Sequence, residues 1–202
     1  MQINNQPTEA PMPGQAELSR TVLEIVGHSL DRDPASIQMK STLWGELGAE
    51  SLDMLDIAFS LESEFGIRLP HSDLLGRAKD YFGDENIVKG GILTDFGLEL
   101  IRRSMPELDR SQIRAGLTPM EFRSMIPVES LVRVVTRLLE LKSKHVCPVC
   151  SGRFADSTAA PELQCIQCGM TQPYISGEQV FIDDMAEIGR AIGFPVHLSN
   201  GN

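Results

Sequence analysis

Residues 47–70 read LGAESLDMLDIAFSLESEFGIRLP, and most of the expected fold follows from this stretch. Apolar residues recur at helical spacing from Ser51 to Phe65, which predicts one amphipathic helix. Gly66 ends this helix, and Pro70 prevents an easy continuation. Its buried stripe is expected to contain Leu52, Leu55, Ile57, Ala58, Phe59 and Leu61. Its polar positions are nearly all acidic: Asp53, Asp56, Glu62 and Glu64.

Ser51 lies at or beside the N-cap of this helix, where two interpretations are open. A capping serine accepts a hydrogen bond from a backbone N–H group, and most serines at such positions do nothing more. A modified serine is the other interpretation, because unpaired N–H groups and the positive end of the helix dipole stabilise an attached phosphate. Spacing alone does not choose between them.

Two further helices are expected, one on each side of this stretch. Residues 16–30 place apolar side chains on one face, and Asp33-Pro34 marks a turn after them. A helix from Val128 to Leu141 is expected to bury Leu131, Val132, Val135, Leu138 and Leu139. Residues 1–15 are predicted to form a flexible N-terminal arm.

The phrase LGAESLDMLD, followed by EFGIRLP, resembles the acyl carrier protein family. That family carries an Asp-Ser-Leu motif, an acidic helix after it and a closing phrase that begins with Phe-Gly. Residues 126–132, IPVESLV, resemble the phrase that opens the last helix of the family. The resemblance covers residues 16–75 and 124–142. It implies a helical bundle.

The resemblance implies that Ser51 is the attachment site of 4′-phosphopantetheine, which a phosphopantetheinyl transferase would move from coenzyme A. The thiol of this arm would carry acyl groups as thioesters, so the protein would be a carrier and not an enzyme. The implied setting is a specialised fatty-acid or polyketide-like pathway, with acyl-processing partners such as a ketosynthase or an acyltransferase. Glu50, Asp53 and Asp56 would face basic patches on these partners, because complementary charge speeds association. A solvated helix face is the alternative for these acids.

Two features depart from the family pattern. Glu50 stands where an Asp usually precedes the serine, which keeps the charge but shifts the carboxylate by one methylene. An insertion at about residues 71–123 stands where the family has only a short third helix. We expect extra helices laid beside the bundle. A functional alternative is a reshaped acyl cavity, or a docking face formed by Arg102, Arg103, Arg110 and Arg114.

The insertion carries clear helix signals. An N-capped amphipathic helix is expected in residues 92–101, with Phe96, Leu100 and Ile101 as its apolar face, and Pro106 ends it. Thr118-Pro119-Met120-Glu121 is a capping box with proline at the first helical position, so a short helix should follow.

The four cysteines form two C-x₂-C pairs, Cys147 with Cys150 and Cys165 with Cys168. Two such pairs can present four thiolates to one tetrahedral Zn²⁺, which predicts a closed, structural zinc ribbon. A CxxC redox protein is the alternative, although no thioredoxin-like context surrounds the pairs. His145 is interpreted as a surface residue. A β-hairpin turning at Ser176-Gly177 and a final helix over residues 183–193 are expected to follow.

The composition limits the classes of partner. The 202 residues include 18 basic and 28 acidic side chains, a net charge of −10, which argues against nucleic acid as the main partner. Residues 16–75 alone hold eleven acids and four bases. No segment has the length of a membrane span and no secretory signal is evident, so a cytoplasmic location is expected.

The expected fold is mostly α: an acyl-carrier-like helical bundle with extra inserted helices, followed by a small β zinc ribbon. The domains are the arm of residues 1–15, a helical domain at 16–142 and a zinc-ribbon module with C-terminal helix and tail at 143–202. An unmodified interaction adaptor of the same fold, with the ribbon docking a partner protein, remains the main functional alternative to a carrier.

Overall fold

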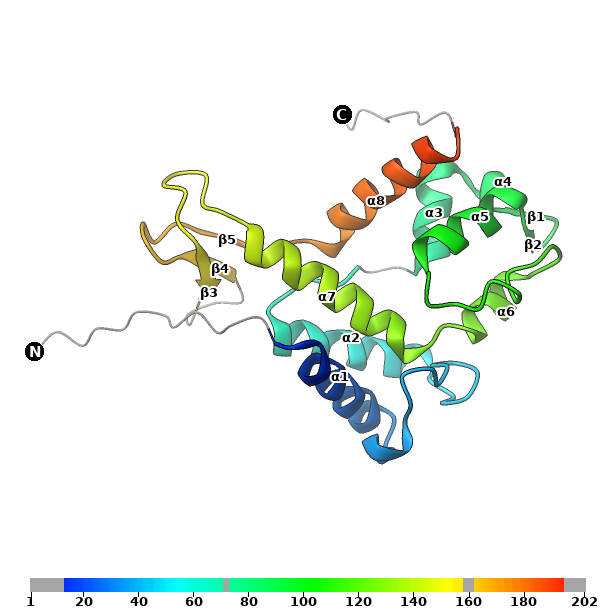
Figure 1. Ribbon diagram of the computed structural model, residues 1–202, viewed down its shortest axis with the longest axis horizontal. Helices are drawn as coiled ribbons and strands as arrows, with labels where there is room; N and C mark the ends of the chain where they lie inside the picture. The colour runs from blue at the N-terminus through cyan, green and yellow to red at the C-terminus, as the bar shows by residue number, and fades with distance from the viewer. Residues whose placement is uncertain (1–12, 71–72, 158–161, 195–202) are drawn as a thin grey trace, which may run out of the picture.

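A computed structural model describes residues 13–70, 73–157 and 162–194 of the chain. Three helices form the carrier bundle: α1 (Gln15–Ser29), α2 (Ser51–Phe65) and α7 (Val128–Lys144). In Figure 1, α7 runs diagonally through the centre of the molecule, with α1 and α2 below it. The predicted N-terminal arm lies mostly outside the described residues, and Gln15 already begins α1.

The core of the carrier bundle is aliphatic. α1 contributes Leu18, Val22 and Val26, and α7 contributes five apolar residues that are all less than a tenth exposed. The long connection from α1 to α2 adds further buried side chains and includes the short 3₁₀ helix η1 (Pro34–Ser36). These contacts confirm the expected helical bundle. The members from the connection and from the segment after α2 are Ile37, Leu43, Leu47, Ala49, Ile67 and Leu69.

The buried stripe expected on α2 is wrong for three of its residues. Leu52, Leu55 and Phe59 are 76%, 65% and 70% exposed, whereas Ile57 and Leu61 are fully buried. The helix is apolar on two sides, and α1 and α7 pack against only one of them. No described element covers the other side, so the packing of neighbouring helices selects which apolar residues enter the core.

The insertion forms a second core beside the carrier bundle (Figure 1). Its helices are α3 (Leu74–Phe82), α4 (Asp84–Ile87), α5 (Asp95–Ser104) and α6 (Pro119–Ser124). A two-stranded antiparallel ladder of β1 (Val88–Lys89) and β2 (Ile92–Leu93) turns at two glycines with positive φ. The largest fully buried side chains that the insertion itself gives to this core are Ile87, Leu100, Ile101 and Phe122.

The helix signals read from the insertion are confirmed for α5 and α6, but Ile92 and Leu93, expected at the start of the first helix, form β2 instead. Thr94 caps α5 by accepting a hydrogen bond from Gly97, and Thr118 and Glu121 form the expected capping box at α6. Leu100 and Ile101 are fully buried, and Phe96 is partly buried against the same core. Local signals therefore set these helix boundaries.

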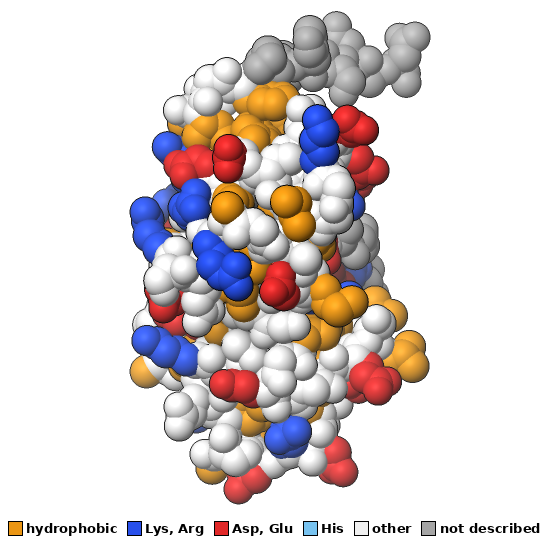
Figure 2. All heavy atoms as spheres, turned by 90° about the vertical axis from the view of Figure 1, so that its right-hand side faces the viewer, with side chains coloured by type: hydrophobic (Ala, Val, Ile, Leu, Met, Phe, Trp, Pro, Cys, Tyr) orange, Lys and Arg blue, Asp and Glu red, His pale blue; other side chains and the backbone are white. Residues whose placement is uncertain are grey.

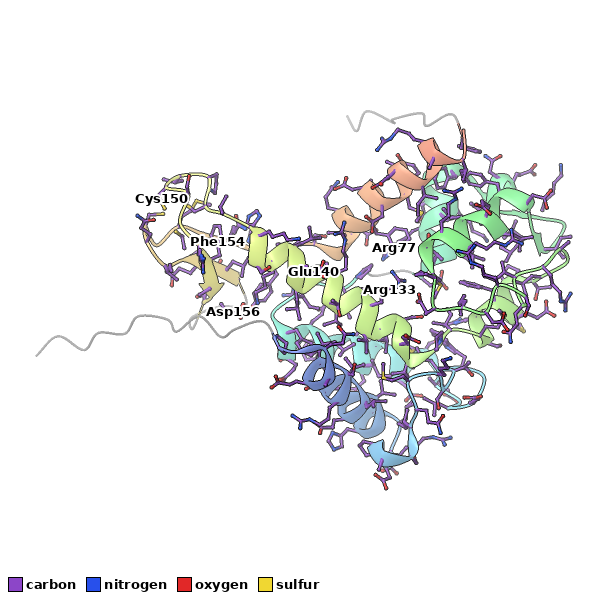
Figure 3. The ribbon with its side chains drawn as sticks, viewed as in Figure 1. Arg77, Arg133, Glu140, Cys150, Phe154 and Asp156 are labelled. Carbon is purple, nitrogen blue, oxygen red and sulfur yellow. The ribbon has the colours of Figure 1, made fainter. Side chains whose placement is uncertain are left out.

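A carboxylate joins the insertion to α7. Glu107, 4% exposed, accepts a hydrogen bond from the Ser130 hydroxyl (2.7 Å) and two from Arg133 Nε (3.1 Å each). Figure 3 shows Arg133 on α7 at the side that faces the insertion. The pairing satisfies a carboxylate that would otherwise be buried without a partner.

Replacing Glu107 with alanine is expected to lower the free energy of unfolding by about 2–3 kcal/mol, because hydrogen bonds to a charged group are lost and Ser130 stays buried. Chemical denaturation followed by circular dichroism measures this change. Glu187→Ala, at an exposed position of the C-terminal helix, is the control and should stay within about 0.5 kcal/mol of the parent. Equal stabilities for the two variants would contradict the assigned role.

The C-terminal helix α8 (Gly177–Ala191) corrects two expectations. The hairpin at Ser176-Gly177 is wrong, because Gly177 begins α8, and the helix starts six residues before the expected Asp183. The Gly177 N–H donates to the Arg68 carbonyl at 2.7 Å, and a Cβ there would lie 2.6 Å from that oxygen. Glycine is thus required for a close approach between backbones. The helix ends two residues before Gly193, whose φ is +73°.

Helix α8 packs onto the insertion. Met185 is buried in the second core, together with the partly buried Phe181, Ile188 and Phe194, while Val180 packs against the carrier core. In Figure 1, α8 lies between α7 and α3. The C-terminal helix, expected beside the zinc ribbon, therefore joins the two helical cores.

The ribbon is a three-stranded antiparallel sheet in the order β3 (Phe154–Asp156), β4 (Glu162–Cys165) and β5 (Thr171–Pro173). Lys142, near the end of α7, connects it to the bundle. Its ammonium group donates to the Phe65 carbonyl at 3.0 Å and to both carboxylate oxygens of Asp156 at 2.7 and 2.9 Å. The ends of α2 and α7 thus hold the base of the ribbon.

Within the described ranges, no helix combines the length and apolarity that crossing a membrane would require.

Candidate functional site

Ser51 is the first residue of α2 and is exposed to solvent. The N-cap position belongs to Glu50, whose backbone is extended (φ −100°, ψ 174°) and whose N–H donates to the Asp53 carboxylate at 2.7 Å. Ser51 is therefore not the capping residue. Its hydroxyl lies at the end of the helix where backbone N–H groups and the helix dipole favour an attached phosphate.

The connection that leads to Ser51 is firmly packed. Leu47 and Ala49 are buried in the carrier core just before the serine. Arg123 of α6 lies over the Trp44 ring, 4.6 Å from its centroid, and Gly45 is so close to α6 that a Cβ would lie 2.6 Å from the Ser124 carbonyl. The insertion therefore helps to hold the segment that positions the serine.

The acidic residues of α2 differ in what they contact. Asp53 is engaged at the N-terminus of the helix, and Asp56 accepts a hydrogen bond from the Ser29 hydroxyl at 2.5 Å. Glu62 is 15% exposed and accepts hydrogen bonds from Arg68 (3.0 Å) and from the Leu69 N–H (2.7 Å). Glu62 is thus a structural residue that shapes the segment after the helix.

The exposed apolar residues of α2 form the main surface beside Ser51. Leu52, Leu55 and Phe59 are spaced i, i+3 and i+7, so they share one side of the helix, and Asp56 lies between them in sequence. We call these four residues the α2 face. An exposed apolar patch with acidic side chains is typical of a surface that binds another protein. The sequence carried a signal for it, because α2 has more apolar positions than two packing helices can cover.

The four cysteines come together at one end of the ribbon. The Sγ atoms of Cys147, Cys150, Cys165 and Cys168 all lie within 4.8 Å of one another. The Cys147–Cys168 and Cys150–Cys165 pairs are 3.6 and 3.5 Å apart. A tetrahedral zinc ion with Zn–S bonds of about 2.3 Å requires sulfurs about 3.8 Å apart, so the cluster fits this ion with a small adjustment.

Backbone N–H groups of the two knuckles point at the sulfurs. Those of Cys168 and Gln167 lower the pKa of the Cys165 thiol to about 6, because they donate hydrogen bonds to the thiolate. Hydrogen bonds of this kind favour the deprotonated form that binds a metal ion. His145 does not join the cluster. It is partly buried, and its ring stacks on Phe154 with the centroids 5.4 Å apart.

The arginines considered as a docking face in the insertion have different surroundings. Arg103 pairs with Glu99 at 2.8 Å, and Arg102 donates to the Ile113 carbonyl at 2.6 Å, so both serve the fold of the insertion. Arg110 and Arg114 are exposed. Figure 2 shows Lys and Arg side chains along one side of the face turned away from the ribbon, with acidic side chains among them.

Comparison with known proteins agrees with this geometry. The family described as "Phosphopantetheine attachment site" matches residues 20–79, which include Ser51. The acyl carrier protein of Thermotoga maritima is 33% identical over 63 residues, 31% of this chain and 78% of that protein. The acyl carrier protein of Treponema pallidum (strain Nichols) is 37% identical over 54 residues, 27% of this chain and 69% of that protein.

A further relative covers less of its own length. Acyl carrier protein AcpXL of Rhizobium etli is 41% identical over 49 residues, 24% of this chain and 53% of that protein. No solved structure gave a significant match.

The class defined by the fold and the site is a helical bundle with an exposed serine at the first position of its helix α2. The chain belongs to the acyl carrier protein family. Its zinc ribbon is supported by the four clustered cysteines. The matched residues 20–79 fall on the carrier part, so the ribbon and most of the insertion lie outside the match.

Proposed function

We propose that this protein carries acyl groups as thioesters on a 4′-phosphopantetheine arm attached to Ser51, in a specialised fatty-acid or polyketide-like pathway. The exposed position of Ser51 at the N-terminus of α2, inside the matched phosphopantetheine segment, carries the proposal. The protein acts as a carrier and not as an enzyme in this proposal, so catalysis belongs to its partners.

The attachment uses Ser51 as the acceptor of a group transfer. The serine Oγ forms a bond to phosphorus while a bond in the pyrophosphate of coenzyme A breaks, and adenosine 3′,5′-bisphosphate leaves. The hydroxyl proton passes to a base on the phosphopantetheinyl transferase. Once attached, the arm supplies a terminal thiol that forms the thioester. The helix end then stabilises the phosphodiester through its N–H groups and dipole.

The α2 face is proposed as the surface that partners bind. Glu50, Asp53 and Asp56 lie within two turns of Ser51, so a transferase, a ketosynthase or an acyltransferase with a basic patch would be steered to the arm. Leu52, Leu55 and Phe59 would add apolar contact. A surface of modest size permits the rapid release that a carrier needs.

Intact-mass analysis tests the proposal. Co-expression with a phosphopantetheinyl transferase should add one phosphopantetheine mass to the chain, and Ser51→Ala should abolish the adduct completely because no other hydroxyl occupies this position. Ser63→Ala, at an exposed serine of the same helix, is the control and should be modified like the parent. Protein isolated from its native cell should carry the same adduct, with or without an acyl group.

The absence of an adduct with several transferases, the native one included, would contradict the carrier and favour the unmodified adaptor. Metal analysis with thiol titration addresses the CxxC redox alternative. One zinc ion per chain with unreactive thiols would contradict redox work at the ribbon.

A further inference from the structure

A compact turn leads to Ser51 and sets the backbone just before it. The Thr42 hydroxyl accepts a hydrogen bond from the Glu46 N–H at 2.9 Å, and the Glu46 carboxylate accepts one from the Thr42 N–H at 3.0 Å. The Leu43 carbonyl, inside the same turn, accepts a hydrogen bond from the Ala49 N–H at 2.9 Å. Ala49 stands two residues before Ser51, so the turn of residues 42–47 determines where the serine enters α2.

Trp44 is the largest side chain of this turn. It packs against the carrier core, and its indole N–H is buried. No described residue accepts a hydrogen bond from that N–H, so the packing of the ring alone fixes its orientation. Arg123 of α6 contributes to this packing, with its guanidinium carbon 4.6 Å from the ring centroid. Tryptophan is the aromatic residue whose face attracts a guanidinium most strongly. The arginine therefore holds the ring, and with it the turn.

Helix α6 is itself fixed by the second core. Phe122, the residue before Arg123, is 1% exposed and belongs to that core. The chain that follows the helix meets the turn directly, since the Leu43 N–H donates to the Ile126 carbonyl at 2.9 Å. The insertion thus supplies a rigid support from which Arg123 covers Trp44.

The charge of Arg123 argues against a role in docking a partner. The proposed partners carry basic patches, which Glu50, Asp53 and Asp56 attract. An arginine repels a patch of this kind. A role inside the molecule, through Trp44, is the one that its position fits.

We propose that Arg123 is a positioning residue for the modification of Ser51. It holds Trp44 and the turn of residues 42–47, so the serine Oγ keeps the orientation in which it bonds to the phosphorus of coenzyme A. In that step the pyrophosphate bond breaks, adenosine 3′,5′-bisphosphate leaves, and the hydroxyl proton passes to the base on the transferase. The role of Arg123 rests on the proposed carrier function. Orientation of a reacting group speeds the transfer and does not tighten binding, so loss of Arg123 should slow the transfer and leave docking at the α2 face unchanged.

Single-turnover transfer separates these two effects. Full-length chains react with coenzyme A and an excess of phosphopantetheinyl transferase, and intact mass gives the rate at each transferase concentration. Arg123→Ala should lower the saturating rate about threefold to fivefold, the factor of one exposed cation–π contact, with an unchanged half-saturating concentration. Arg123→Lys should give an intermediate rate, because an ammonium group keeps the charge but does not stack on the ring. Arg110→Ala removes the same charge from an exposed position of the insertion and is the control.

A double-mutant cycle with Trp44→Leu tests whether Arg123 acts through the ring. Removal of Arg123 should have no further effect on the rate once Trp44 is gone, whereas additive losses would overturn the proposal. An unchanged saturating rate for Arg123→Ala, or an equal loss in Arg110→Ala, would overturn it as well. Circular dichroism verifies that each variant stays folded.

Two measurements on the unmodified protein follow the same contact without the transferase. Acrylamide quenching of Trp44, the single tryptophan of the chain, should increase in Arg123→Ala but not in Arg110→Ala. Hydrogen exchange at the Ala49 amide should become faster in Arg123→Ala, since the turn loses its support. A parent chain that takes no arm from any transferase would contradict the carrier function. A parent that takes the arm, with quenching and exchange unchanged in Arg123→Ala, would overturn the role of Arg123 alone.

Discussion

Removal of the metal ion is expected to unfold the zinc ribbon while the helices keep their structure. Among the ribbon residues that the structure describes, Cys147, Leu163 and Cys165 are the buried ones, so apolar burial contributes little stability. Four thiolates within 4.8 Å of one another repel without a cation between them. Structural zinc sites of this size bind with apparent free energies of about 10–16 kcal/mol near neutral pH, and most of that is folding energy.

The measurement is a titration with a chelator, followed by NMR signals of β3–β5 and by far-UV circular dichroism for the helices. Cys165→Ser should have the same effect without a chelator, because a hydroxyl does not replace a thiolate ligand. Gln167→Ser, in the same knuckle but without a ligand atom, is the control and should bind zinc like the parent. Ribbon signals that persist in metal-free protein would contradict the structural role of zinc.

Loss of the ribbon is expected to leave Ser51 modification intact. The contact between ribbon and α2 lies at Phe65, the last residue of the helix, whereas Ser51 is its first. The fifteen residues of the helix separate the two ends by about 22 Å at 1.5 Å per residue. Failure of Cys165→Ser to accept the phosphopantetheine arm would show that the two parts are coupled through α2.

The ion pair of Arg77 and Glu178 holds α8 to the insertion. We expect removal of the glutamate charge to lower stability more than removal of the arginine. Arg77 of α3 is only 4% exposed, and its guanidinium lies 3.2 Å from the Glu178 carboxylate, which is 42% exposed. Figure 3 shows Arg77 on the side of α3 that faces α8. Burial lowers the pKa of Arg77, with the carboxylates of Glu178, Asp73 and Asp80 acting in the opposite direction. The arginine is thus the more deeply buried member of the pair.

Glu178→Gln should lower the free energy of unfolding by about 2 kcal/mol, because a buried cation loses its closest carboxylate. Arg77→Met should lower the free energy of unfolding by about 1 kcal/mol or less, because the remaining Glu178 carboxylate reaches water. In the parent protein the guanidinium carbon lies 4.6 Å from the centroid of the Phe181 ring, and a methionine keeps contact with this ring. Chemical denaturation of both variants and of the double variant measures the coupling. A larger loss for Arg77→Met would contradict this account.

Much of the candidate site could be predicted from local sequence. Ser51 is placed by a short motif and by the helix that begins with it. The cysteines are placed by a spacing that favours one shared metal ion. The capping box at Thr118 and Glu121 and the stop at Gly66 act through neighbouring backbone groups, so they set helix ends without help from the rest of the chain.

Other features were decided by packing between distant segments. The expected hairpin at Ser176-Gly177 failed because Gly177 instead meets the Arg68 carbonyl, a contact that no local signal announces. Glu62 became structural because the chain folds back to place Arg68 and Leu69 beside it. Periodicity identifies apolar positions but cannot say which side a neighbour will cover, so it predicts burial for Leu52, Leu55 and Phe59 as well.

The sequence by itself determined helix α2, the serine at its first position and the two cysteine pairs, because each depends on residues that are close along the chain. The tertiary structure decided that α2 keeps an exposed apolar face, that α8 joins two cores, and that Lys142 fixes the ribbon to the end of α2. The physical reason is the same in each case. Side-chain burial is a property of the neighbours that arrive from elsewhere in the chain, and only the folded molecule brings them together.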